Sequence, residues 1–170
     1  LPYQPIVPAV ALQVMRIPRI LLLLSALAAP SAAAVPAPRP PLDVILAASS
    51  LIKRVVPAQA AYFVVELIAP EAALDVFEVE SRGTRIVLRG SNGVAIASAL
   101  NWYLEHVAGI TIAIPLRPVA LALPLPRVNA RVRIATPYKY RYFFNYCTFS
   151  YSMAWWDWEQ WQRMIDWMAL

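Results

Sequence analysis

The sequence predicts an α/β fold in which a small sheet with flanking helices precedes the start of a larger domain. Three observations support this prediction. Apolar residues recur at helical spacing over residues 44–55, residues 76–80 and 84–89 alternate as strands do, and a glycine-containing turn then leads into a second helical pattern. A further strand, loop and helix pattern follows residue 131 and stops at Leu170, as expected for the first unit of something larger.

The N-terminal part has the layout of a targeting segment. Arg16 and Arg19 precede an apolar core, and small residues follow up to Ala34. We assign residues 15–34 to a secretory signal peptide. The alternatives are a membrane anchor and a buried helix. The apolar core is too short to cross about 30 Å of hydrocarbon, and Pro30 interrupts it.

Two further N-terminal segments surround this leader. Residues 1–14 precede the Met and are expected to be translated upstream sequence, whereas residues 35–41 are expected to form a Pro-rich tether. The mature protein is expected to have no membrane span. It would be exported, to the periplasm or the medium of a bacterium or to the lysosome of an animal cell.

The small domain is expected over residues 42–131. Its first helix ends at Pro57, and its first strand, over residues 62–68, is β-branched and aromatic. Residues 76–80 alternate between Val or Glu on one face and Phe or Val on the other, which is typical of a half-buried strand. A turn then leads to a strand over residues 84–89.

A glycine-containing turn over residues 90–93 precedes the second helix, expected over residues 94–106. Ser91 or Asn92 would cap this helix, and Gly109 would stop it. Such a turn can cradle a phosphate, but G-S-N-G lacks both nucleotide-binding patterns, so we interpret it as a tight turn that lets the helix pack on its sheet. Another strand is expected over residues 110–114, followed by an apolar extension at 121–126.

The composition argues against several classes of function. The net charge is +5, but two of the arginines lie in the leader and the other basic residues are scattered, which does not favour nucleic-acid binding. One His and one Cys cannot supply a metal ligand set, so we expect no metal and no cofactor.

The C-terminal part is rich in aromatic residues. We expect an aromatic strand over 138–144, a loop over 145–153 and a helix over 154–170. The residues expected to pack this helix on a sheet share helical spacing and are Trp158, Trp161, Ile165 and Met168. The nearby carboxylates, Asp157, Glu159 and Asp166, are interpreted as solvated groups that compensate the helix dipole.

The loop over residues 145–153 mixes amide, hydroxyl and thiol groups with aromatic rings. Rings stack on the apolar faces of a pyranose, and amides and hydroxyls bind its hydroxyl groups. The loop therefore fits a sugar site, and a merely structural aromatic loop is the alternative.

Several sequence motifs resemble the alpha-N-acetylglucosaminidase family. They are ATPYKYRYFFNYCTFSYS over residues 135–152, WWDW over 155–158, IDWMAL over 165–170 and RGSNGVA over 89–95. The resemblance implies a small α/β domain before a (β/α)8 TIM barrel, of which residues 132–170 would be the truncated beginning. It also implies that Asn145 and Cys147 contact the sugar.

The resemblance further implies hydrolysis of terminal alpha-linked N-acetylglucosamine with retention, by two Glu residues on later barrel strands. These residues have no counterpart here, so we expect the chain to be an inactive N-terminal fragment, and Glu159 should take neither role. The alternatives are a non-catalytic carbohydrate-binding or interaction module and another barrel glycosidase with a similar accessory domain.

Overall fold

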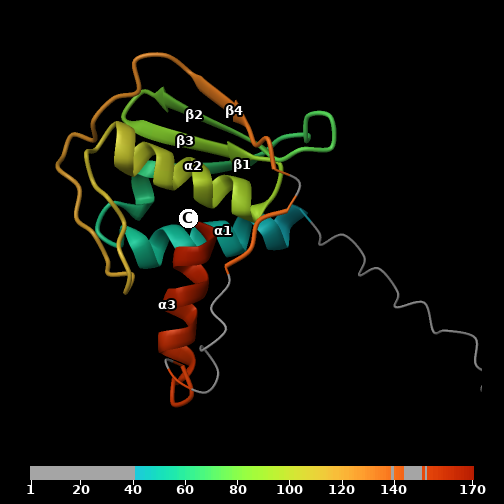
Figure 1. Cartoon of the computed structure of the whole chain (residues 1–170). Helices are drawn as coiled ribbons and strands as arrows, with labels where there is room; N and C mark the ends of the chain where they lie inside the picture. Colours follow the sequence, from blue (N-terminus) through green and yellow to red (C-terminus); the bar gives the residue numbers. More distant parts are fainter. Residues whose placement is uncertain (1–40, 139, 144–150, 152) are drawn as a thin grey trace, which may run out of the picture. The chain divides into compact units, whose positions relative to one another are not determined.

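The computed structural model describes residues 41–138, 140–143, 151 and 153–170 (Figure 1). Its elements, in chain order, are α1 (Pro41–Val55), η2 (Ala60–Tyr62), β1 (Phe63–Leu67), β2 (Val76–Arg82), β3 (Arg85–Gly90), α2 (Gly93–His106), β4 (Val132–Ala135) and α3 (Trp158–Ala169). No helix among these described residues is long and apolar enough to cross a membrane. The signal peptide, the residues before it and nearly all of the tether lie outside this part of the chain.

The sheet has four strands in the order β1-β3-β2-β4. β1 runs parallel to β3, and β2 runs antiparallel to both β3 and β4. Helices α1 and α2 lie on the same side of this sheet (Figure 1). The predicted mixture of a small sheet and flanking helices is therefore confirmed.

Alternation along the strands divides the sheet into two different faces. Val79 and Leu88 are paired across β2 and β3 and lie in the apolar core with α1 and α2. Glu78 and Arg89, also paired across these strands, lie on the opposite face. Helix α1 contributes the buried residues Ala48, Leu51, Ile52 and Val55, as its apolar periodicity predicts.

The turn before α2 allows close packing, as we interpreted it. An added Cβ at Gly90 would lie only 2.6 Å from the backbone nitrogen of Ile96, so only glycine lets the helix approach the strand this closely. The side chain of Asn92 accepts a hydrogen bond from the backbone nitrogen of Ala95, which identifies it as the cap.

Two expected strands are not formed by the described residues. Residues 110–114 have no strand partner. Instead, the backbone nitrogen of Ile110 donates to the carbonyl of Leu104 at the end of α2, and Ile110 and Ile112 pack on the core. Residues 138 and 140–143 are also irregular, and residue 144 lies outside the described residues. An apolar or aromatic run favours a strand, but a strand also needs a neighbour for its hydrogen bonds.

The sheet also extends beyond the boundary expected after residue 131. Val132–Ala135 forms β4, a four-residue edge strand paired with β2. Its alternation explains this, because Arg133 faces Glu78 while Ile134 is on the other side. The division of the chain into domains remains a prediction, but these four residues belong structurally to the small sheet.

Tyr103 connects α2 to the segment that runs back toward β4. Its ring packs edge-on against Phe63 at 5.6 Å, and its hydroxyl donates to the carbonyl of Pro126 at 2.9 Å. Burial raises the pKa of Tyr103 to about 12. The neutral phenol is thus favoured by the folded state.

We therefore expect Tyr103 to govern part of the alkaline dependence of stability. An unfolded tyrosine has a pKa near 10, so the contribution of Tyr103 to the free energy of unfolding is complete below about pH 10. As the pH rises from about 10 toward about 12, this contribution is lost, and the total loss is about 3 kcal/mol. Urea unfolding at several pH values, in the parent and in Tyr103→Phe, measures this. The variant should start about 1 kcal/mol less stable and fall less steeply with pH. If the free energy of unfolding fell equally with pH in the two proteins, Tyr103 would not be the group responsible.

Candidate functional site

The two predicted sugar contacts, Asn145 and Cys147, lie outside the described residues. The structure does describe residues on both sides of them. Several of the flanking aromatic side chains are exposed, namely Tyr138, Tyr140, Tyr142, Tyr151 and Trp155. Exposed rings of this kind can stack on the apolar face of a sugar, so the flanks suit the predicted ligand.

The start of α3 is fixed by its own polar groups. The Asp157 side chain accepts a hydrogen bond from the backbone nitrogen of Gln160 at 2.9 Å, and the Gln160 side chain accepts one from the backbone nitrogen of Asp157 at 3.0 Å. This capping box explains why the helix begins at Trp158 rather than at residue 154 as expected. Asp157 thus caps the helix.

The packed face of α3 differs from the predicted one. Trp158, Ile165 and Met168 are exposed, whereas Met164 is buried and Trp167 packs against the core. Helical spacing identifies residues that share a face, but it does not identify which face meets the rest of the molecule.

The expectation that Asp166 is a solvated carboxylate is wrong, because the residue is buried. Its two carboxylate oxygens accept hydrogen bonds from Nε and Nη2 of Arg54, at 2.6 and 2.7 Å. This hydrogen-bonded pairing raises the pKa of the Arg54 guanidinium, although partial burial opposes the shift. A buried carboxylate needs such a partner, so the pair favours the orientation of α3 in which Asp166 faces Arg54.

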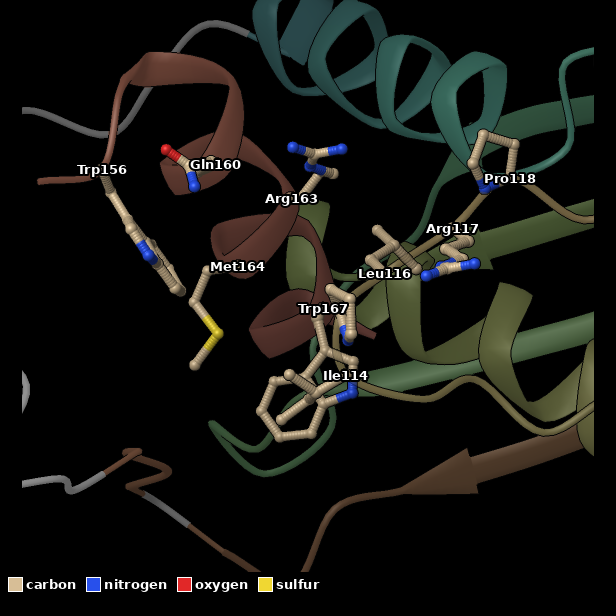
Figure 2. Close-up of a pocket in the computed structure, with 10 residues that line it drawn as sticks. Ile114, Leu116, Arg117, Pro118, Trp156, Gln160, Arg163, Met164 and Trp167 are labelled. Carbon is tan, nitrogen blue, oxygen red and sulfur yellow. The ribbon is translucent and has the colours of Figure 1, made fainter. Parts of the chain in front are cut away.

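A cavity of about 810 Å³ lies between α3 and the loop at residues 114–118 (Figure 2). Its walls are mainly apolar and aromatic, with Leu116 and Ile114 from the loop facing Met164 and Trp167 from the helix. None of the described residues that line it is a carboxylate. The cavity can therefore hold apolar or aromatic groups, and the described part of its lining supplies no carboxyl group as a general acid.

The carboxylates on the face of the sheet opposite the apolar core are also unsuited to acid catalysis. Arg89 donates to Glu66 and Glu80, at 2.6 Å in each case, and to Glu78 at 3.3 Å. These hydrogen bonds lower the pKa of Glu66 and of Glu80. A glycosidase acid needs a raised pKa, so this cluster is a structural network.

Asp75 joins three parts of the chain near the start of β2. Its carboxylate accepts hydrogen bonds from Asn92 Nδ2 at 2.6 Å and from Ser91 Oγ at 3.4 Å, and it also pairs with Arg141. Its backbone carbonyl accepts a hydrogen bond from the nitrogen of Thr136 at 2.8 Å. Asp75 therefore connects the turn before α2 to the segment that leads toward residue 144.

Comparison with known proteins accounts for both parts of the chain. Residues 46–127 match the family model described as the alpha-N-acetylglucosaminidase N-terminal domain, and residues 141–170 match the tim-barrel domain of the same family. The chain belongs to the alpha-N-acetylglucosaminidase family. The sequence-based resemblance is thereby confirmed, and with it the class of glycoside hydrolases.

The relatives of this family are much longer than the chain. It is 42% identical to human alpha-N-acetylglucosaminidase over 129 residues, which are 73% of this chain and 17% of the human protein. A family 89 glycoside hydrolase from Clostridium perfringens, in complex with 2-acetamido-1,2-dideoxynojirmycin, superposes with a TM-score of 0.71 and 32% identity over 76% of this chain and 15% of its own. A structure of the Clostridium perfringens protein with its substrate GlcNAc-alpha-1,4-galactose superposes with a TM-score of 0.70 and 32% identity, over 75% of this chain and 15% of its own.

Sequence reasoning missed the paired charges that hold these parts together. Asp166 is interpreted from the sequence as a solvated carboxylate, yet it binds Arg54, which lies 112 positions earlier in the chain. Strand periodicity could have suggested the Glu66, Glu78 and Arg89 cluster, because all three lie on the face opposite the core. No local pattern predicts a pair as distant as Arg54 and Asp166.

Proposed function

We propose that the chain is the N-terminal part of an exported enzyme that hydrolyses terminal alpha-linked N-acetylglucosamine from glycans, with retention of configuration. The observation that carries this proposal is that residues 46–127 and 141–170 match two successive domains of one glycosidase family. The substrate class is supported by the bacterial relative, whose substrate is GlcNAc-alpha-1,4-galactose. Export rests on the signal-peptide layout of residues 15–34.

The catalytic pair is proposed to lie on barrel strands beyond the matched 141–170 segment. Retaining hydrolysis requires two carboxyl groups about 5–5.5 Å apart, one of them with a raised pKa. Glu66 and Glu80 have lowered pKa values, and exposed Glu159 pairs with Arg163 of its own helix, at 3.6 Å. The 170 residues alone would therefore be inactive.

The exposed apolar side chains of α3 support a barrel context. Trp158, Ile165 and Met168 together present a large apolar surface on one helix. Helices of a (β/α)8 barrel pack against neighbouring barrel elements, and such neighbours would cover these side chains.

We further propose that Asn145 and Cys147 contact the bound sugar. This assignment rests on their positions in the family motif and on the exposed rings of Tyr142 and Tyr151 that flank them in the sequence. Asn145 would supply a directed hydrogen bond to a hydroxyl group, whereas Cys147 would shape the pocket wall.

The decisive experiment compares two polypeptides. The DNA downstream of codon 170 is read, and the complete reading frame and the 170-residue chain are both assayed with an aryl alpha-N-acetylglucosaminide. We expect turnover by the complete protein and none by the chain, with kcat/KM lowered by about 10-fold or more in Asn145→Ala of the complete protein. Turnover by the chain alone would overturn the proposal that the catalytic pair lies beyond the matched 141–170 segment. A complete protein without turnover would overturn the proposed function.

A non-catalytic carbohydrate-binding module is the second candidate, favoured by the exposed Tyr140, Tyr142 and Trp155. It predicts that the 170-residue chain binds GlcNAc-alpha-1,4-galactose by itself and that no complete form hydrolyses it. Isothermal titration with this disaccharide, alongside the activity assay, separates the two functions.

A further inference from the structure

Two ion pairs connect the segment that matches the N-terminal domain with the segment that matches the barrel. Arg54, in the last turn of α1, binds Asp166 of α3 through two hydrogen bonds. Asp75, just before β2, binds Arg141 in the aromatic segment. In each pair, one residue lies within 46–127 and the other within 141–170.

The members of these pairs on the small domain are held in place independently of their barrel partners. Arg54 projects from a helix whose neighbouring residues Ile52 and Val55 are buried in the core. Asp75 is oriented by Asn92 and Ser91 of the turn before α2. Both side chains are thus presented from a rigid scaffold, which is what a positioning contact requires.

The burial of the two ion pairs indicates which pair holds the two segments together more strongly. The Asp166 side chain is 6% exposed, whereas that of Asp75 is 27% exposed. Loss of Arg54 would remove the partner that the described residues supply to this buried carboxylate, which is strongly unfavourable. Arg54 is therefore the stronger contact, and Asp75 contributes a second, more exposed one.

We infer that Arg54 and Asp75 are positioning residues for the barrel, an inference that rests on the proposed function for its catalytic consequence. Arg54 fixes α3, and Asp75 fixes the chain through Arg141, so the two contacts orient both flanks of residues 144–150 on the small domain. Small errors in the placement of binding groups lower rates substantially, so these remote residues should influence catalysis without touching the substrate.

The first test uses the 170-residue chain and requires no activity. Hydrogen exchange is measured on Arg54→Met, on Arg54→Lys and on the control Arg163→Met, which removes the exposed Glu159 pair on the same helix. We expect Arg54→Met to speed exchange of α3 amides at least 10-fold while β1 and β3 amides change little. Arg54→Lys keeps the charge but not the two-point contact and should lie between the parent and Arg54→Met.

Two outcomes of this exchange experiment would overturn the inference. Unchanged α3 exchange in Arg54→Met would show that the pair does not hold the helix. Equal acceleration over α3 and the sheet would show a general structural role instead of a positioning one. If Arg54→Met does not fold, the same two criteria are applied to Arg54→Lys.

The second test uses the complete enzyme. Arg54→Lys and Asp75→Asn should each lower kcat/KM by about 10-fold or more at temperatures where both variants are fully folded, and Arg163→Met should match the parent. Parent-like kcat/KM in both variants would refute the catalytic consequence. A parent enzyme without activity would refute the proposed function, and the exchange experiment would still decide whether Arg54 positions α3.

Discussion

Replacing Arg89 by Met is expected to destabilise the chain by about 3 kcal/mol. The Arg89 side chain is 11% exposed and joins three glutamates from β1 and β2, and the side chain of one of them, Glu78, is only 7% exposed. Met fills a similar volume but leaves the carboxylates without this cation, and breaking a buried ion pair costs several kcal/mol. Urea unfolding followed by circular dichroism measures the change.

The same variant should lose part of its sensitivity to acid. Hydrogen bonds from Arg89 lower the pKa of Glu66 and of Glu80 below the ordinary 4.5. Their stabilising contribution is therefore present above about pH 4.5 and is lost as the pH falls through the lowered values. Arg85→Met, at an exposed position of the same strand, is the matched control and should change stability by less than about 0.5 kcal/mol. Equal losses of unfolding free energy in Arg89→Met and Arg85→Met would refute the stabilising role of Arg89.

Replacing Gly90 by Ala is expected to be at least as disruptive, at about 3 kcal/mol or more. The new methyl group would lie 2.6 Å from the nitrogen and 2.8 Å from Cγ1 of Ile96, and 2.9 Å from the carbonyl carbon of Ala95. Two of these atoms belong to the backbone of α2, so the helix itself would have to shift away from the sheet. The melting temperature should fall by more than 10 °C.

Gly93→Ala is the control for this prediction. Its added Cβ would make only an ordinary contact, 3.8 Å from Cγ1 of Val44, and the residue begins α2. Alanine restricts the unfolded chain and favours the helix, so we expect unchanged or slightly higher stability. A Gly90→Ala variant as stable as Gly93→Ala would show that α2 is not held closely against β3.

Much of the small domain was predictable because its signals are local. The periodicity of residues 44–55 predicted α1, the alternation at residues 76–80 predicted a two-faced strand, and Asn92 was one of two predicted caps for α2. Each of these patterns reflects a preference within a few residues of the chain, namely which side chains point the same way or which side chain can bond a free backbone nitrogen. The family motifs extended this reading to the glycosidase class.

Only the tertiary structure decided how distant segments meet. The pairing of β4 with β2, the irregular path of residues 110–114 and the docked face of α3 all depend on which partner is available for hydrogen bonds or burial. The clearest case is Asp166, which by its sequence resembles any solvated carboxylate on a helix. It is buried because the fold brings Arg54 to it, since a carboxylate loses its water only where a partner replaces the lost hydrogen bonds.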